Sequence, residues 1–521
     1  MSDKPAETVD AVVIGAGFGG LGTALRLAEG GAKVVLCETL KYPGGCASTF
    51  SHKGYRFDAG ATLLAGLAEG QLFARWLARH GQSVDVEILD PILTLRTPDF
   101  ELPVPKDRDR FRDALAAVPG IPDDARLDRF LTIQRDTADA LWPVLDDPDL
   151  LPPLGVAQVL AHAKRLPSYL PALRFLGRPL SAVLAACGLE RCEPLRQVLD
   201  AICQITLQCP ADEAEAPVAL ATLDYFFRGA AHVRGGVGEL AEAMVRAFEQ
   251  AGGEIRYATR VKSIEAVGRR WRVTTRRGVL DSGVVAANLL PQNLAAMLPE
   301  KLGRRFAGLA RDVDGSWGAA MLYRVLEAPG DACPDAHHLE MVQDPSQPFL
   351  AGNHLFASLS SAAESERAGP GRRTLTVSTH VPMDELRRLD AEAQGAYIHD
   401  IQERLRRGLR DFAPDWWNQP VFETTASPRT FERFTGRRDG LVGGVPRRAG
   451  LGGYLGAFYR PSLPGLALVG DSAFPGQSAL ATAAGGAAVA RRLLGRLDLG
   501  TRQTRTSGAP TPFVRPEAGA P

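Results

Sequence analysis

Two glycine-containing motifs near opposite ends of the 521-residue chain constrain its fold more than any other feature. Residues 11–20 read AVVIGAGFGG, an apolar segment that runs into a Gly-x-Gly-x-x-Gly pattern. Residues 466–478 read LALVGDSAFPGQS, a second apolar segment that ends in Gly470-Asp471. A site closed by both ends of a long chain is how a large flavin dinucleotide is held. The two motifs therefore predict a single nucleotide site.

The first motif predicts a β-α-β unit that binds a dinucleotide. A strand at residues 10–14 leads into glycines that allow a tight turn, close approach of a phosphate and close packing of helix on strand. The helix expected at residues 19–30 points its N-terminal amides at the pyrophosphate. An acid at the end of the next strand is placed to hold a ribose hydroxyl. The expected cofactor contacts are Gly15, Gly17, Phe18, Gly19, Gly20 and Glu38.

The following segments add further expected contacts. Gly44-Gly45 would bring backbone amides to a second phosphate oxygen, although an ordinary turn explains the pair equally well. Residues 231–285 contain Arg-Gly-Gly-Val-Gly before a helix, followed by three alternating strands. In such a meander Val261 would offer its backbone to the adenine edge, and a plain β-meander is the alternative. Gly60 and Ala61, in the segment FDAGAT, complete this set.

The second motif indicates that the dinucleotide is FAD. Its strand delivers Asp471 to the carboxyl end, where a carboxylate suits a ribityl hydroxyl of the flavin. A helix that begins near Ser478 would direct its positive end at the pyrimidine edge, where charge gathers in the reduced form. The expected contacts here are Gly470, Asp471, Ser478 and Ala479.

Composition argues against several other functions. The chain has 60 basic and 60 acidic residues, and this balance gives no indication of nucleic-acid binding. Its 7 cysteines form no Cys-x-x-Cys pair, which fits a reduced, cytoplasmic compartment and suggests no metal site. The polar, acidic N-terminus is unlike a signal peptide, and no apolar run approaches about twenty residues.

Residues 151–189 differ from the rest because they contain basic residues but no acid. Lys164, Arg165, Arg174 and Arg178 lie there among Leu, Ala and Pro. One interpretation is the outer face of helices in a substrate domain. The other is a basic, apolar surface that lies on an anionic membrane, which would place the protein peripherally on the inner membrane face.

The order of motifs along the chain carries a family resemblance. Between residue 10 and about residue 495 the chain reads VVIGAGFGGLGTALRLA, PGGCASTF, YRFDAGAT, HVRGGVGELAEAM, SPRTFERFTGRRDGLVGG and LVGDSAFPGQS. These segments resemble the bacterial-type carotenoid desaturases and carotenoid isomerases, a family that includes phytoene desaturases, C-3′,4′ desaturases and retinol saturases. The resemblance implies non-covalent FAD, a carotenoid-like apolar polyene as substrate, and peripheral attachment to a membrane. GGCASTF and SPRTFERFTGR favour the isomerase and C-3′,4′ desaturase branch.

The expected fold is α/β, a Rossmann-like FAD-binding domain of the glutathione-reductase and amine-oxidase type with an inserted α+β substrate-binding domain. The motifs assign residues 1–66, 230–292 and 455–498 to the FAD-binding domain. Residues 67–229 and 293–454 form the substrate-binding, membrane-facing domain. The tail at 499–521 is expected to be disordered, and residues 362–372 to form an exposed loop.

Some positions depart from the family pattern. After Pro-Gly-Gln the family usually has Gly and then Ile or Val, where this chain has Ser478-Ala479. Cys46 stands where the family often has Arg after the Gly-Gly pair. The helix at 478–490 is rich in Ala and Gly, and its small side chains would widen the pocket near the flavin. The substrate is therefore expected to differ from the family norm.

An unactivated hydrocarbon has no polar group on which a catalytic acid or base could act. The flavin must therefore perform the chemistry, for example by accepting a hydride at N5. Residues 140–160 and 220–230 are candidates to line an apolar tunnel. Arg429 and Glu432 are candidates to steady a charged intermediate, with an ion-paired structural loop as the alternative. No other catalytic residue is assigned.

Three reactions share such a site. Desaturation passes electrons to an acceptor such as oxygen or a quinone, isomerisation uses reduced FAD without net redox change, and saturation reduces the polyene. We expect desaturation, the commonest use of this scaffold. A flavin amine oxidase is an alternative, but residues 475–495 contain no aromatic residue and no Lys follows Lys301. A GDP-dissociation inhibitor, which shares the fold but does not maintain the FAD site, is a further alternative.

Overall fold

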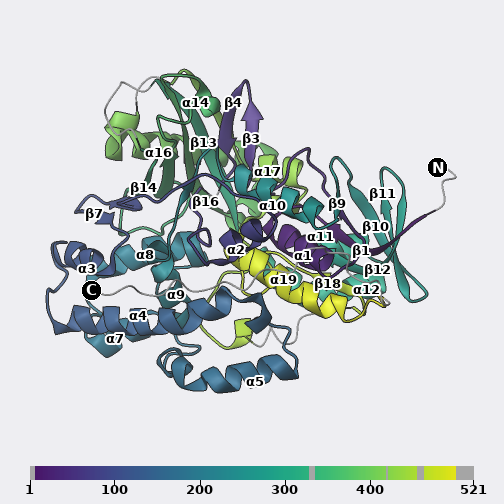
Figure 1. The fold of residues 1–521 in the computed structure, drawn as a ribbon. Helices are drawn as coiled ribbons and strands as arrows, with labels where there is room; N and C mark the ends of the chain where they lie inside the picture. Colours follow the sequence, from purple (N-terminus) through teal and green to yellow (C-terminus); the bar gives the residue numbers. More distant parts are fainter. Residues whose placement is uncertain (1–5, 61, 328–334, 418–419, 455–462, 500–521) are drawn as a thin grey trace, which may run out of the picture.

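The structure is a computed structural model that describes residues 6–60, 62–327, 335–417, 420–454 and 463–499 (Figure 1). Ala61 and the tail at 500–521, both the subject of expectations above, lie outside the described residues. Two seven-stranded sheets form the framework, and helices cover both (Figure 1).

The first sheet has β1 (Glu7–Ile14) at its centre. β2 (Val34–Cys37) and β12 (Val279–Ala287) flank it, and both run parallel to it. β9 (Glu254–Arg256) extends the sheet beyond β2, and β18 (Leu466–Leu468) runs parallel to the end of β12. Because the carboxyl ends of parallel strands share one edge, the segments that follow β1 and β18 meet there.

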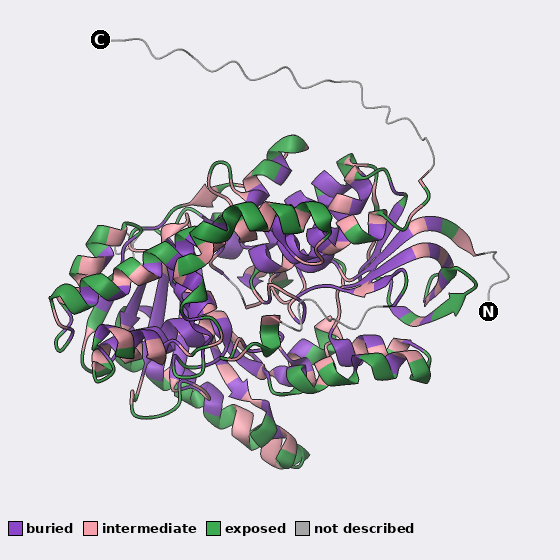
Figure 2. Cartoon of the chain, turned by 90° about the horizontal axis from the view of Figure 1, so that it is seen from below, coloured by how far each residue is buried: buried purple, intermediate pink, exposed green. Residues whose placement is uncertain are grey.

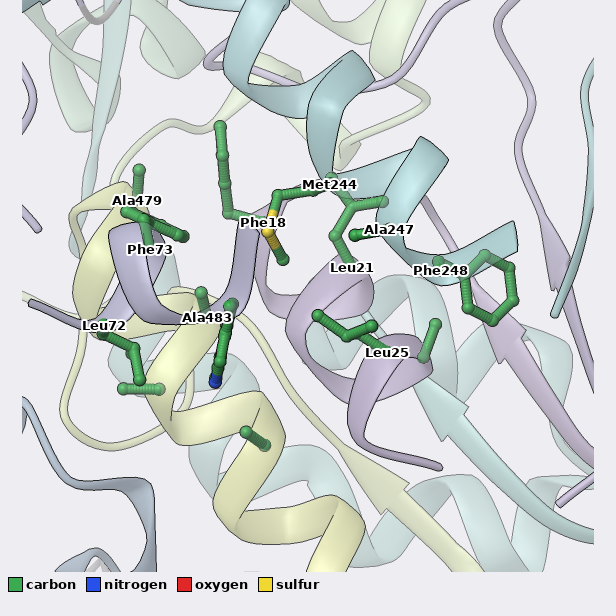
Figure 3. Packing of buried hydrophobic residues seen from close by; sticks show 14 of the residues in the cluster. Phe18, Leu21, Leu25, Leu72, Phe73, Met244, Ala247, Phe248, Ala479 and Ala483 are labelled. Atoms are coloured by element: carbon green, nitrogen blue, oxygen red, sulfur yellow. The ribbon is translucent and has the colours of Figure 1, made fainter. Parts of the chain in front are cut away.

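Three helices pack together against this sheet (Figure 3). α1 (Phe18–Glu29) lies between α10 (Gly238–Gln250) and α19 (Ala479–Leu494). An added Cβ at Gly22 would lie 2.4 Å from the carbonyl oxygen of Ala483, so the backbones of α1 and α19 approach closely. The Ala- and Gly-rich composition of α19 therefore serves helix packing along most of its length. Its first turn, at residues 479–482, lines the cavity described below, so small side chains of this helix border the pocket there.

The second sheet is mostly antiparallel and has the order β17-β13-β16-β15-β14-β6-β7. α16 (Ala391–Phe412) covers one face with Leu405 and Leu409. The other face packs against a helical layer that includes α4 (Ala125–Leu145), α8 (Glu193–Leu207) and α9 (Ala216–Leu223). The strands are β6 (Leu93–Arg96), β7 (Glu101–Val104), β13 (Trp317–Glu327), β14 (His337–Val342), β15 (His354–Leu359), β16 (Arg372–Pro382) and β17 (Phe422–Ala426).

Figure 2 shows the strands of both sheets as largely buried, whereas the outer helices alternate between buried and exposed faces. α2 (Leu72–Arg79) packs in the same core as α1, beyond the domain boundary expected at residue 66. Among the described residues, none of the helices is both long enough and apolar enough to cross a membrane. Further elements are β3 (Thr49–His52), β4 (Tyr55–Asp58), β5 (Val86–Glu87), α3 (Arg108–Ala116), α5 (Val156–Arg165), α6 (Leu170–Leu173), α7 (Ser181–Cys187), β8 (His232–Val233), α11 (Pro291–Met297), α12 (Glu300–Gly303), α13 (Ala307–Asp314), α14 (Ser365–Ala368), α15 (Met383–Arg388) and α17 (Pro428–Thr435).

Two segments differ from the expectations. The first strand of the predicted meander is divided into β9 and β10 (Val261–Val267), which lie on opposite edges of the sheet, and Ala258 between them has φ 50°. Residues 362–372 are not simply an exposed loop, because Glu364 is 2% exposed and Arg367 is 3% exposed. Both side chains enter an interior ion-pair network, which a local run of polar residues does not reveal.

Candidate active site

One cavity of about 630 Å³ connects the predicted nucleotide contacts with the second sheet and the helical layer. Gly20 and Gly470 do not line it, because they lie where backbone packs against Gly15 and Asn288. Ala61 is outside the described residues. The predicted cofactor contacts that line the cavity are Gly15, Gly17, Phe18, Gly19, Glu38, Gly44, Gly45, Gly60, Val261, Asp471, Ser478 and Ala479.

The glycine turn after β1 leaves bare backbone at the cavity. Gly15 has φ +91°, and an added Cβ at Gly17 would lie 2.7 Å from the Asn288 side-chain amide. Gly44, with φ +106°, donates its N–H to the carbonyl of Ala16 at 2.8 Å. Two glycine turns therefore meet next to the N-terminus of α1, an arrangement that fits a pyrophosphate.

Asn288 is a cavity residue that the sequence analysis missed. It directly follows β12 and donates to the carbonyl of Gly15 at 3.4 Å. The signal was available, because a polar residue at the carboxyl end of a buried parallel strand points to the binding edge of such a sheet.

Glu38 lies at the carboxyl end of β2 and is 6% exposed. Its carboxylate accepts hydrogen bonds from the N–H of Ala16 at 2.6 Å and the N–H of Leu40 at 2.7 Å. Burial raises the pKa of Glu38, and these backbone hydrogen bonds oppose the rise. The carboxylate is thus fixed at the rim of the cavity, where a ribose hydroxyl would reach it.

Asp471 follows β18 and is paired with a residue from a distant segment. The Arg437 guanidinium donates to its carboxylate at 2.7 Å and also donates to the carbonyl of Leu441. Both charged side chains line the cavity, with exposed fractions of 16% and 18%. Arg437 is the one charged residue of the SPRTFERFTGR segment that lines it.

Arg429 and Glu432, the two catalytic candidates of that segment, are not brought to the cavity. Both are exposed on α17. Arg429 donates to the side chain of Gln394 at 2.8 Å, and Glu432 accepts the N–H of Asp439 at 3.2 Å. Helical periodicity explains the outcome: α17 buries Phe431 against β13, so its neighbours Arg429 and Glu432 face outward.

Ser478 combines an unfavourable backbone conformation with a helix cap. Its φ of 89° and ψ of 151° lie in a region occupied almost only by glycine. The Ser478 hydroxyl accepts the N–H of Ala481 at 3.1 Å, which caps α19. The departure noted in the sequence therefore falls where a glycine is conformationally preferred, at the wall of the cavity.

The helical side of the cavity is mostly apolar, with Thr222 and Tyr225 as polar exceptions. It includes Leu141, Trp142, Val144 and Leu145 from α4, together with Ala221 from α9 and Phe226 just beyond it. These residues come from the two segments expected to line a tunnel. Such a surface fits an apolar chain and excludes water from it.

The side of the cavity formed by the second sheet is mixed, with Ala319, Met321 and Phe356 beside a group of polar side chains. His354 lines it, and its Nε2 lies 2.8 Å from the carboxylate of Glu340, which is 0% exposed. Ser378 and His380 of the neighbouring strand also line it. Burial lowers the pKa of His380 to about 3, so its ring is neutral at pH 7. Sequence reasoning missed these residues because strand register, rather than local spacing, brings them together.

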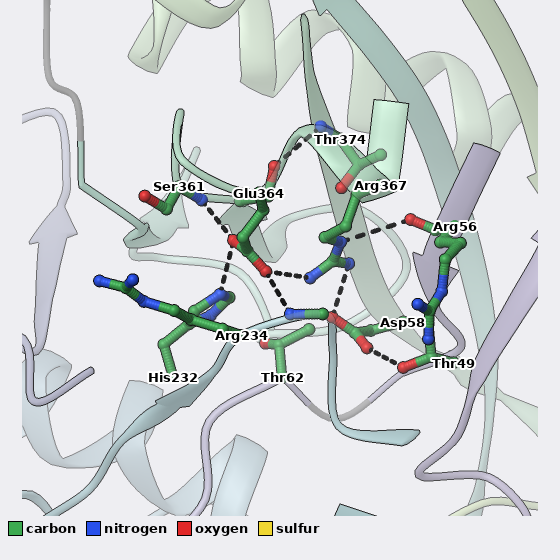
Figure 4. Close-up of polar contacts among 12 residues, drawn as sticks. Thr49, Arg56, Asp58, Thr62, His232, Arg234, Ser361, Glu364, Arg367 and Thr374 are labelled. Carbon is green, nitrogen blue, oxygen red and sulfur yellow. Dashed lines mark hydrogen bonds and ion pairs between the residues drawn. The ribbon is translucent and has the colours of Figure 1, made fainter. Parts of the chain in front are cut away.

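A buried ion-pair network near the cavity joins segments that are distant in the chain (Figure 4). Arg367 of α14 donates to Asp58 of β4 at 2.8 Å, and Glu364 pairs with His232 at 2.9 Å. The same carboxylates accept backbone N–H groups from the turn before α10, those of Gly235 and Val237. The partners come from β4, from β8 and the turn after it, and from the segment between β15 and β16, so the network holds these three segments together.

Comparison with known proteins agrees with this geometry. The model of NAD(P)-binding Rossmann-like domains matches residues 13–90, and that of FAD dependent oxidoreductases matches residues 183–446, about half of the chain. Prolycopene isomerase from Arabidopsis thaliana is 26% identical over 94% of this chain and 83% of its own length. All-trans-retinol 13,14-reductase from Macaca fascicularis is 27% identical over 53% of this chain and 46% of its own length.

A solved structure of a putrescine oxidase variant has the same fold. It superposes with a TM-score of 0.62 at 14% sequence identity, and the match covers 94% of this chain and all of that one. At this identity the likeness concerns the architecture alone.

Proposed function

We propose that this chain isomerises a double bond of a long apolar polyene. The chain belongs to the FAD-dependent oxidoreductases and is a relative of the carotenoid isomerases and retinol reductases. The observation that carries the proposal is the single cavity that joins an FAD cradle to an apolar wall. Isomerisation replaces the desaturation expected from the sequence, because the relative that matches nearly the whole chain is named an isomerase.

FAD would be held without a covalent bond by the residues at the edge of the first sheet. Glu38 would bind the ribose, Gly45 would donate its backbone N–H to phosphate, and Asp471 would bind the ribityl chain. Burial raises the pKa of the Cys46 thiol at this cavity, which keeps it protonated and a poor nucleophile for a covalent link. When bound, FAD supplies hydride or electron exchange with the substrate.

The protein's own contribution is placement. α4 and α9 would hold the polyene chain by apolar contact, and Arg437 would keep the Asp471 carboxylate oriented. Isomerisation needs no external electron acceptor because its product has the same composition as its substrate. Saturation by reduced FAD is the second candidate, supported by the match to the retinol reductase over half of the chain. Desaturation would require oxygen or a quinone as acceptor.

Attachment to a membrane surface is part of the proposal. α5 and the turns after it expose large apolar side chains, with Val156 79% and Leu170 63% exposed. Lys164, Arg165 and Arg174 are exposed within the same segment, which contains no acid. Nε2 of His162, in α5, lies 2.8 Å from the carbonyl oxygen of Leu150. Leu151, which follows Leu150, lines the cavity. This surface would lie on anionic lipid and give an apolar substrate a short path to the cavity.

The experiment is to express the protein in cells that accumulate polyenes with defined cis bonds and to measure product mass and absorbance. An absorbance shift without a mass change supports isomerisation. A gain of two hydrogens would establish saturation instead, and a loss of two hydrogens would establish desaturation.

A further inference from the structure

We propose that the second-sheet side of the cavity binds a hydroxyl group, so that the preferred substrate is a polyene alcohol rather than a plain hydrocarbon. This inference rests on the proposed function, because it takes the cavity to be a polyene site. The observation behind it is the contrast between the apolar wall from α4 and α9 and the hydrogen-bonding wall from β15 and β16.

Strand register places the polar side chains on one face of the sheet. Val342 of β14 is paired with His354 of β15, and Glu340 with Phe356, so all four share the face that packs toward the helical layer. β16 continues this face, because Ser378 is paired with Phe356. The side chains that a ligand would meet there are His354, Phe356, Ser378 and His380.

Glu340 orients the His354 ring. Its carboxylate lies 2.8 Å from Nε2, and within the described part of the chain Glu340 is the only hydrogen-bond partner of that ring. Nδ1 of His354 is therefore the ring atom left to bind a ligand. Among the described residues, the second carboxylate oxygen of Glu340 is buried and has no hydrogen-bond partner. This face of the sheet therefore contains an unused hydrogen-bond acceptor.

A hydroxyl matches this wall better than other end groups do. It can donate to Nδ1 of a neutral imidazole or accept from a protonated one, whereas a hydrocarbon leaves the nitrogen unpaired. A ligand carboxylate would bring a second negative charge close to the buried Glu340. Neutral His380 and the hydroxyl of Ser378 offer both a donor and an acceptor nearby. The chemistry of the wall thus selects an uncharged, hydroxylated end.

The test compares the binding of two C20 polyenes, all-trans-retinol and its analogue with a terminal methyl group in place of CH₂OH. Dissociation constants for the FAD-loaded protein are measured by tryptophan quenching at a fixed detergent concentration. We expect the alcohol to bind about tenfold more tightly or better. His354→Leu should bring the two constants within about twofold of each other. Glu340→Gln should keep most of the preference, since an amide oxygen still accepts from Nε2–H, whereas Glu340→Leu should lose it.

His337→Leu is the matched control, because His337 lies on the opposite face of β14 against Trp416. It should keep the full preference. Flavin absorbance and the thermal midpoint show that each variant is folded and loaded. Equal binding of both polyenes to the wild-type protein, or an undiminished preference in folded His354→Leu, would overturn the inference. Failure of both polyenes to bind would instead contradict the proposed polyene site on which it depends.

Discussion

Arg437 and Asp471 form an ion pair at 2.7 Å that joins the segment after α17 to the segment after β18. The pair lines the same cavity as the glycine turn after β1, and the two segments approach closely, since an added Cβ at Gly19 would lie 2.7 Å from the Cα of Gly470. Arg437 is thus the charged residue through which the SPRTFERFTGR segment takes part in the site.

Asp471→Ala should weaken FAD binding by about tenfold to a hundredfold, because a hydrogen bond to a charged group is lost. The measurement is the FAD dissociation constant from reconstitution of the apoprotein, followed by flavin absorbance. Arg429→Ala and Glu432→Gln serve as controls and should leave this constant unchanged, since both side chains face outward on α17. Loss of FAD in either control, with Asp471→Ala unaffected, would contradict the assigned site.

Ser478→Gly should give a more stable protein than Ser478→Ala. The backbone conformation at residue 478 costs about 1–3 kcal/mol for residues other than glycine, and the glycine variant avoids this cost. Alanine retains that conformation and also loses the cap on α19, which costs about 1 kcal/mol. Thermal midpoints of the two variants, measured with FAD bound, give the comparison. A higher midpoint for the alanine variant would show that residue 478 does not have a positive φ.

Acid should destabilise the wild-type protein through Glu364. Burial alone would raise the pKa of this carboxyl, but the hydrogen bond from His232 and the charge of Arg367 lower it from 4.5 to about 2. A depressed pKa contributes stability that is present above pH 4.5 and is lost as the pH falls toward 2, about 3 kcal/mol in all. Urea midpoints of wild type and Glu364→Gln between pH 6 and pH 3 test this. The wild-type midpoint should fall more steeply, and parallel curves would refute the assignment.

Leu160→Glu with Leu170→Glu should abolish binding to vesicles that contain anionic lipid. The two substitutions remove exposed apolar surface, 59% and 63% exposed, and add negative charge to a segment without acids. Co-sedimentation with anionic and neutral vesicles measures the effect. Val267→Glu is the control, since Val267 is an exposed apolar residue on β10, far from this segment in sequence. Equal sedimentation of all three proteins would eliminate membrane attachment through α5.

The residues at the first-sheet end of the cavity could be predicted from the sequence because local patterns encode their position. Gly15, Gly17 and Glu38 belong to one β-α-β unit, in which spacing along the chain fixes position in space. The position of Asp471 was predictable for the same reason, since it comes shortly after the short buried strand Leu466–Leu468.

The substrate end was not predictable in this way. His354, Glu340 and His380 come together only through the register of three strands, and no local spacing contains that information. Glu364 and Arg367 lie in a segment that reads as a solvated loop, yet their partners Asp58 and His232 are distant in the chain. The small residues of α19 were visible in the sequence, but their packing against α1 depends on the tertiary fold.

The most direct test of the central claim is an anaerobic reaction of the purified protein with a cis-polyene, in the presence of either oxidised or photoreduced FAD. Product mass and absorbance are recorded together, and protein denatured before addition provides the background. The proposed function predicts a shift to the trans spectrum without a change in mass, and only with reduced FAD. A mass change of two hydrogens, or a spectral shift that is independent of FAD, would contradict it.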